Sequence, residues 1–135
     1  MPTLLEIVAP DRLLLAQPVD MVVIPAAEGE MGVLPGHSPM IVLLRGGTIT
    51  LHEGGRPTAQ LFVSGGFAEV TPERCTVLAD EATPVAEVSR ATAEARLREA
   101  EAEYDAADKM NIPAVEAAMG RMQSARAMLA AAGAA

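Results

Sequence analysis

The stretch "TITLHEGGRPTAQLFVSGGFAEVTPERCTVLAD", residues 48–80, alternates short apolar segments with turn signals. In "TITLH", Ile49 and Leu51 fall on one face of an extended chain, and "ERCTVLAD" alternates in the same way. The segments "EGGRP", "SGG" and "TPE" between them have the composition of tight turns. This stretch therefore predicts consecutive short strands joined by turns.

The same pattern continues on both sides and predicts a β-rich first part of the chain. The candidate strands are Leu4–Val8, Leu13–Ala16, Val19–Pro25, Met40–Leu44, Thr48–His52, Ala59–Ser64, Phe67–Thr71 and Thr76–Ala79. Many short strands at this spacing are typical of an antiparallel sandwich or barrel. We expect "GEMGVLPGHSP", residues 29–39, to be a loop.

The composition changes near residue 86. Nine of the eleven glycines and nine of the ten prolines precede this point, whereas seventeen alanines follow it. Glycine and proline interrupt regular structure, and alanine is the best helix former. We therefore expect a β-sandwich domain over residues 1–86 and a helical hairpin over residues 87–135.

Two helices are predicted in the second part. Ser89 and Asn111 are suitable N-cap residues, and Pro113 is tolerated only in the first turn of a helix. The apolar stripe expected on the first helix is Ala93, Leu97, Ala100, Tyr104 and Ala107, and that on the second is Val115, Ala118, Met119, Met122, Ala125 and Leu129. A short break between such helices predicts an antiparallel hairpin.

Charge and composition argue against several classes of protein. The net charge is -8 and aromatic residues make up 2% of the chain, so we expect no nucleic-acid partner. The single cysteine, Cys75, excludes an internal disulfide and fits a small core residue. The N-terminal residues lack the pattern of a signal peptide, and we expect no membrane-spanning segment.

Sites for catalysis, metals or phosphate are weakly supported. His37 beside Ser38 suggests a base and a nucleophile, but a turn histidine bonded to its own loop is the better interpretation. His37, His52 and Cys75 are too scattered to predict a metal site. Glycines 29, 32 and 36 match neither the P-loop nor the dinucleotide pattern. We expect no catalytic residue, no metal and no cofactor.

Two longer motifs carry a resemblance to a known family. "VVIPAAEGEMGVLPGHSPMIVLLRGGTITL" (residues 22–51) and "LFVSGGFAEVTPERCTVLADEA" (residues 61–82) resemble the two signatures of the epsilon subunit of the F-type ATP synthase, called delta in mitochondria. The two motifs occur in the family's order and precede an alanine-rich hairpin. Together they are more specific than either would be alone.

The resemblance implies a non-catalytic subunit of a rotary motor. In this family a β-sandwich of about ten strands sits on the gamma subunit in the central stalk and touches the ring of c subunits. It couples rotation of the c-ring to ATP synthesis. The expected partners are gamma, the c-ring and, through the hairpin, the alpha/beta catalytic head. The expected location is peripheral, on the cytoplasmic face of a bacterial inner (plasma) membrane, with membrane association only through the complex.

The resemblance also assigns contact residues. Its c-ring contacts fall on Glu30, Met31, Gly32, Pro35, Gly36, His37 and Ser38. Its gamma contact uses one sheet face, for which we expect Val63, Ser64, Gly65, Gly66 and Phe67. Prolines fix φ and glycines allow sharp reversals, so residues 29–39 are expected to form a rigid docking surface.

The hairpin regulates ATP hydrolysis in some relatives, in which it extends into the catalytic head, and lies folded on the sandwich in others. Some relatives bind ATP through I/L-D-x-x-R-A at the start of the first helix. Here that segment is "VSRATA", residues 88–93, with Ser89 at the acidic position and Thr92 at the arginine position. We therefore expect weak or absent ATP binding.

Two other hypotheses remain open on the sequence alone. The first is a free adaptor protein with the same β-sandwich and helical hairpin. The second is a small enzyme that uses His37.

Overall fold

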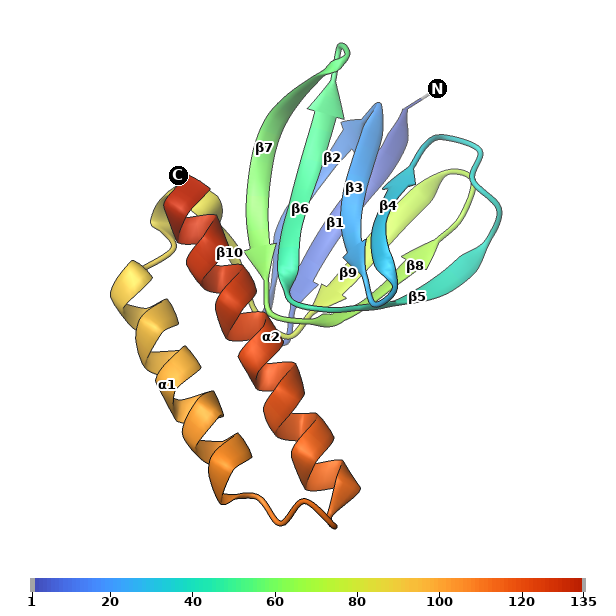
Figure 1. Ribbon diagram of the computed structural model, residues 1–135. Helices are drawn as coiled ribbons and strands as arrows, with labels where there is room; N and C mark the ends of the chain where they lie inside the picture. Colours follow the sequence, from blue (N-terminus) through green and yellow to red (C-terminus); the bar gives the residue numbers. More distant parts are fainter. Residues whose placement is uncertain (1, 135) are drawn as a thin grey trace.

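The computed structural model describes residues 2–134 (Figure 1). The strands are β1 (Thr3–Ala9), β2 (Arg12–Val19), β3 (Met21–Ala26), β4 (Gly29–Val33), β5 (Met40–Leu44), β6 (Gly47–Glu53), β7 (Arg56–Val63), β8 (Gly66–Val70), β9 (Arg74–Ala79) and β10 (Ala82–Pro84). A short 3-10 helix, η1 (Val85–Glu87), leads to helices α1 (Arg90–Ala106) and α2 (Ile112–Ala134). The predicted sandwich followed by a helical hairpin is confirmed.

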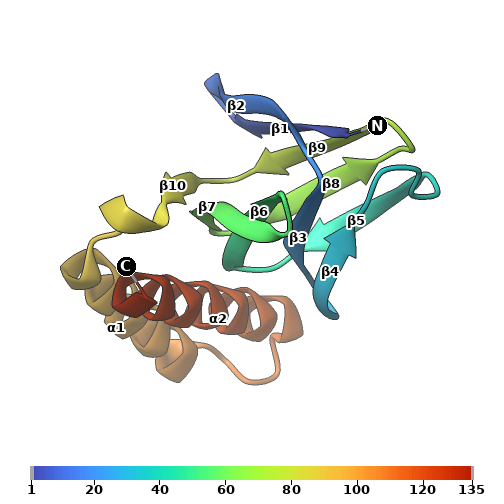
Figure 2. The ribbon, with the colours of Figure 1, turned by 90° about the horizontal axis from the view of Figure 1, so that it is seen from above.

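The strands form one sheet that folds back on itself into two facing layers (Figure 2). Its order is β10-β7-β6-β3-β5-β8-β9-β1-β2, with β4 paired to β3 outside this path. The pairs are antiparallel as predicted, except that β1 runs parallel to β9. These two strands are far apart in the sequence, so no tight turn constrains them to run in opposite directions.

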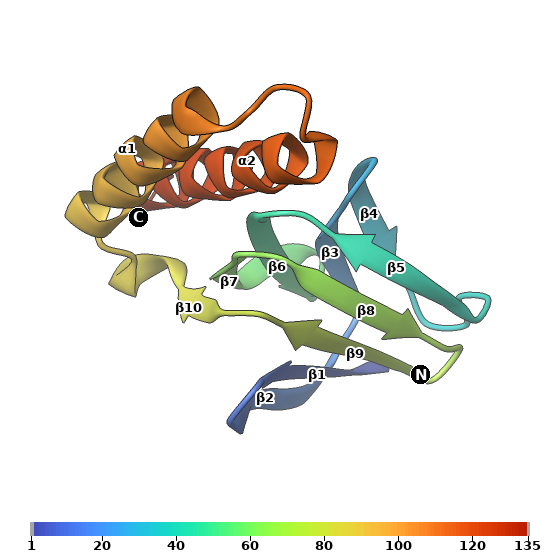
Figure 3. The ribbon, with the colours of Figure 1, turned by 90° about the horizontal axis from the view of Figure 1, so that it is seen from below.

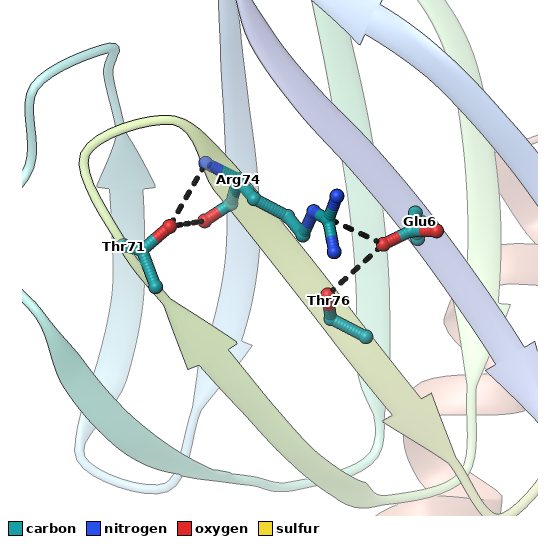
Figure 4. A network of polar contacts seen from close by, with 4 residues as sticks. All are labelled: Glu6, Thr71, Arg74 and Thr76. Atoms are coloured by element: carbon teal, nitrogen blue, oxygen red, sulfur yellow. Dashed lines mark hydrogen bonds and ion pairs between the residues drawn. The ribbon is translucent and has the colours of Figure 1, made fainter.

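A small polar network crosses the parallel pair (Figure 4). The Glu6 carboxylate on β1 accepts a hydrogen bond from Thr76 Oγ1 at 3.3 Å and lies 3.4 Å from Arg74 Nε on β9. Thr71 in turn is bonded to the backbone of Arg74, which fixes the turn before β9. Exposed ion pairs of this kind contribute at most about 1 kcal/mol, so the network sets the register more than it stabilises the fold.

Alternating side chains of the strands fill the space between the two layers. Leu5 and Ile7 on β1 are fully buried against Cys75 and Val77, their register partners on β9. The central core also contains Val22, Ile24, Ile49, Leu51, Val63 and Val70. The prediction that Cys75 is a core residue is confirmed.

Two strands were not predicted from the sequence. Residues 29–33 were expected to be part of a loop but form β4, which pairs with β3 from Val22↔Val33 to Ala26↔Gly29. β10 is three residues long and pairs only with β7. Both are defined by their partner strand rather than by their own residue preferences, which are weak in a segment such as "GEMGV".

The helices begin at the predicted caps. Thr92 N–H donates to Ser89 Oγ at 3.1 Å, and Ala114 N–H donates to Asn111 Oδ1 at 3.3 Å. Of the predicted apolar stripes, the fully buried positions are small residues: Ala93, Ala100, Ala118 and Ala125. Most of the larger residues of the stripes, such as Leu97 and Val115, are partly buried. Met119 was expected in the stripe of α2 but is exposed.

The hairpin lies folded against one end of the sandwich (Figure 3). Phe62 points out of the sheet and is fully buried in a second apolar cluster, separate from the central core. The hairpin supplies Ala93, Met128 and Ala131 to this cluster, and η1 supplies Val85. The hairpin therefore covers an apolar side chain of the sandwich in addition to closing on itself.

Candidate functional site

The residues expected to contact a c-ring fall into two groups, one within β4 and one in the loop that follows it (Figure 1). Glu30, Met31 and Gly32 belong to the strand, and Glu30 lies beside the β3–β4 turn. Glu30 and Gly32 are exposed, whereas Met31 packs partly against the core. Residues 35–38 follow the other end of the strand. A partner that touches both groups must therefore lie along this edge strand.

The loop after β4 is fixed by hydrogen bonds. Gly36 N–H donates to the carbonyl of Pro72 in the β8–β9 turn at 2.8 Å, and His37 N–H donates to the carbonyl of Leu34 at 3.2 Å. Gly36 has φ +83°, a conformation that favours glycine. His37 Nδ1 bonds the Ser38 carbonyl at 2.8 Å, which confirms a turn histidine bonded to its own loop.

The segment expected to contact gamma connects β7 to β8, and only part of it is free surface. Val63 and Gly65 are buried, and the Ser64 carbonyl accepts a hydrogen bond from Ser124 Oγ of the hairpin at 2.9 Å. Gly66 has φ +127°, and a Cβ there would lie 2.1 Å from the Leu78 carbonyl oxygen. Gly65 and Gly66 are thus needed for the backbone conformation, and Phe67 is the residue of this segment with an exposed side chain.

Among the described residues of the sandwich, the two most exposed large apolar side chains lie on β5, next to Phe67. Ile41 is 74% exposed, Leu43 68% and Phe67 42%. Leu43 and Phe67 are register partners, and Ile41 lies two positions along the same face of β5. We call Ile41, Leu43 and Phe67 the apolar strip. Adjacent exposed apolar side chains on a sheet mark an interaction surface.

Sequence reasoning found only one member of the apolar strip. The signal for the other two was the run "MIVLL", residues 40–44, which is apolar on both faces of a strand. Val42 and Leu44 fill the core, so Ile41 and Leu43 require a different partner.

A cleft of about 940 Å³ separates the hairpin from the end of the sandwich. Its two helix arginines are already paired, Arg96 with Glu81 and Arg121 with Glu103. Arg96 donates two hydrogen bonds to the Glu81 carboxylate, at 2.6 and 2.9 Å, and these bonds hold the pKa of Glu81 below its usual value. The two helix arginines of the cleft are therefore neutralised by carboxylates, whereas Arg45, which also lines the cleft, is in none of the described ion pairs.

Cys75, one of the groups considered for a metal site, is buried in the core. Burial raises the pKa of the Cys75 thiol to about 11, so this side chain stays protonated at neutral pH. Among residues 2–134, no cluster of three or more histidine, cysteine or acidic side chains could hold a metal ion. Neither of the two described helices is long and apolar enough to span a membrane.

Comparisons with known proteins agree on one family. Residues 3–85, more than half of the chain, match the family model described as ATP synthase, Delta/Epsilon chain, beta-sandwich domain. The ATP synthase epsilon chain of Granulibacter bethesdensis is 65% identical over 96% of this chain and 96% of its own length. That of Gluconacetobacter diazotrophicus is 50% identical over 98% of this chain and 94% of its own length.

Solved structures show the same architecture. A chain in the cryo-EM structure of Euglena gracilis mitochondrial ATP synthase, OSCP/F1/c-ring in rotational state 1, has a TM-score of 0.76 and 28% identity, and the match covers 96% of this chain and 81% of that one. A chain of the Tetrahymena thermophila central stalk and c-ring, at 14% identity and a TM-score of 0.66, shares the fold. This chain belongs to the delta/epsilon chain family of ATP synthases.

Proposed function

We propose that the chain is a non-catalytic rotor subunit in the central stalk of an F-type ATP synthase, where it couples c-ring rotation to ATP synthesis. The membership of the family and the high identity to two bacterial epsilon chains support this function. The observation that carries it is the apolar strip, because a soluble sandwich has no internal use for Ile41 and Leu43 at the surface. A free adaptor protein is not favoured.

The gamma subunit is the proposed partner of the apolar strip. Full burial of a side chain of this size contributes roughly 1.5–3 kcal/mol. The three side chains lie on two paired strands, so they form a preorganised surface and lose little freedom on binding. Of the five residues expected to contact gamma, this assignment retains Phe67, and it adds Ile41 and Leu43.

The c-ring is the proposed partner of the β4 edge. Glu30 has an exposed carboxylate near one end of the strand. The turn of residues 35–38, which is held by backbone hydrogen bonds, follows the other end. The two groups are separable by mutation. Glu30→Lys is expected to weaken coupling in membrane vesicles without changing the fold, and His37→Ala probes the other end independently.

The chain is proposed to reach the membrane only through this complex, on the cytoplasmic face of a bacterial inner membrane. The bacterial epsilon chains among its relatives support membrane association of the assembly.

ATP binding is proposed to be weak or absent. Ser89, at the position of the ATP motif's acidic residue, serves as the cap of α1, and the two helix arginines of the cleft, Arg96 and Arg121, are paired with carboxylates.

Binding to purified gamma tests the proposed function. Leu43→Asp places a charge in the apolar strip and is expected to weaken binding at least tenfold in titration calorimetry. Leu13→Asp is the matched control, because Leu13 is 56% exposed but lies on the edge strand β2. Equal affinity of the Leu43 variant and the wild type would refute the proposed gamma surface, and absence of wild-type binding would refute the function itself.

A further inference from the structure

The apolar strip has a charged side chain of opposite sign at each of its two ends. Glu69 follows Phe67 by two positions on β8 and is the register partner of Ile41, so it lies on the same face of the sheet. Arg45 follows Leu43 by two positions, just after β5, and lines the cleft together with Leu43 and Phe67. The strip therefore has a positive end beside Leu43 and a negative end beside Ile41.

Both charges are available to a partner. Arg45 and Glu69 are exposed, and among residues 2–134 neither side chain takes part in an ion pair. Their backbones are held in place, because Arg45 N–H donates to the Pro25 carbonyl at 3.0 Å and Glu69 lies in β8, which is paired on both sides. The two charges are thus carried by a fixed backbone, at either end of an apolar surface.

The negative end of the strip is hollowed. Glu69 lines a hollow of about 340 Å³ together with Thr71, Glu73, Arg74 and Thr76, which we call the acidic hollow. The charge of Arg74 is balanced by Glu6, 3.4 Å away on β1, toward which its side chain points (Figure 4). The carboxylates of Glu69 and Glu73 are in none of the described ion pairs. The acidic hollow therefore fits the cationic end of a lysine or arginine side chain.

The positive end of the strip has different surroundings. Asp80 and Glu99 also line the cleft, but neither makes a described ion pair with Arg45. The other two arginines of the cleft are already paired with carboxylates. A carboxylate of a partner that reaches this end is attracted by Arg45, whereas a cation of the partner meets it as a like charge.

We infer that Arg45 and Glu69 set the orientation in which gamma lies on the apolar strip. The inference rests on the proposed function, in which gamma covers this strip. The contacting segment of gamma has apolar side chains over the strip, a carboxylate beside Arg45, and a lysine or arginine in the acidic hollow. The reversed orientation brings like charges together at both ends, so both ends disfavour it. Residues 41–45 span roughly 13 Å of extended chain, which matches about nine residues of an α-helix.

Binding of purified gamma to the full chain tests the orientation by titration calorimetry. The double variant Arg45→Glu/Glu69→Arg reverses the two charges and leaves the net charge unchanged. It is expected to bind gamma at least about thirtyfold more weakly than the wild type. Arg56→Glu/Asp11→Arg is the matched control, because both residues are exposed and lie outside the strip. The control is expected to bind with wild-type affinity.

Single neutral variants separate the two ends of the strip. Arg45→Gln and Glu69→Gln are each expected to weaken binding of gamma about three- to tenfold. The difference in affinity from the wild type is expected to shrink at high salt, because salt screens exposed charges.

The outcomes distinguish this inference from the proposed function. Wild-type affinity of the double variant, together with weakened binding by Leu43→Asp, would overturn the orientation and leave the proposed gamma surface intact. Absence of wild-type binding to gamma would overturn both. Urea unfolding shows whether each variant keeps its fold. If the double variant does not fold, the two neutral variants decide, and unchanged affinity in both would overturn the inference.

Discussion

Substitution of Phe62 tests how much the hairpin adds to the free energy of unfolding of the sandwich. Its side chain is fully buried, but by Ala93, Met128 and Ala131 of the hairpin rather than by the central core. In the full chain, Phe62→Ala is expected to cost about 3–5 kcal/mol of unfolding free energy, as for other buried phenylalanines. In a chain that ends at residue 86, the same side chain is largely uncovered, and the substitution is expected to cost less than about 1 kcal/mol.

The assay is urea unfolding of four proteins, followed by circular dichroism: both chain lengths, each with and without the substitution. The expected coupling between truncation and substitution is at least about 2 kcal/mol. Phe67→Ala is the control, because Phe67 is the other phenylalanine and is 42% exposed. Its cost is expected to be small in both backgrounds.

Two results would refute this reasoning. An equal cost of Phe62→Ala in the long and the short chain would show that the hairpin does not bury this residue. Loss of the β signal on truncation alone would show that residues 1–86 are not an independent domain, as we propose them to be.

Three further predictions concern single positions. Gly66→Ala should cost several kcal/mol in thermal or urea unfolding, because its Cβ would lie 2.1 Å from the Leu78 carbonyl oxygen. Ser89→Ala should cost about 1 kcal/mol of helix stability, seen as lower amide protection in the first turn of α1, whereas Ser89→Asp should retain the cap. Because the pKa of Glu81 is lowered by Arg96, the stability from this pair is present above the range in which an ordinary glutamate titrates and is lost as the pH falls through the lowered pKa. Glu81→Gln should therefore make stability less dependent on pH in the acidic range, and an unchanged acid profile would contradict this role.

Local patterns predicted most of the fold. The alternation of Ile49 and Leu51 and the turn glycines between segments were sufficient for β6 to β9, because each of these strands pairs with its neighbour in sequence. β4 was missed, because Glu30 and its glycines gain a strand conformation only from pairing with β3. The parallel pairing of β1 with β9 is a long-range contact that local patterns do not contain.

The candidate site was less predictable than the fold, because a docking surface consists of the apolar side chains that are not buried in the core. Ile41 and Leu43 look like core residues until the structure shows that Val42 and Leu44 fill the core from the other face. The exposure of Met119 likewise reflects the exact phase of a helix in which nearly every position is small or apolar.

The central claim is that this chain connects a rotating shaft to a membrane ring, and ATP synthesis in reconstituted vesicles measures that connection directly. A synthase depleted of its own epsilon chain should make ATP slowly under an imposed proton gradient, and addition of this chain should restore the rate. Synthesis that proceeds equally fast with and without the added chain, although the chain is bound to the complex, would contradict the account.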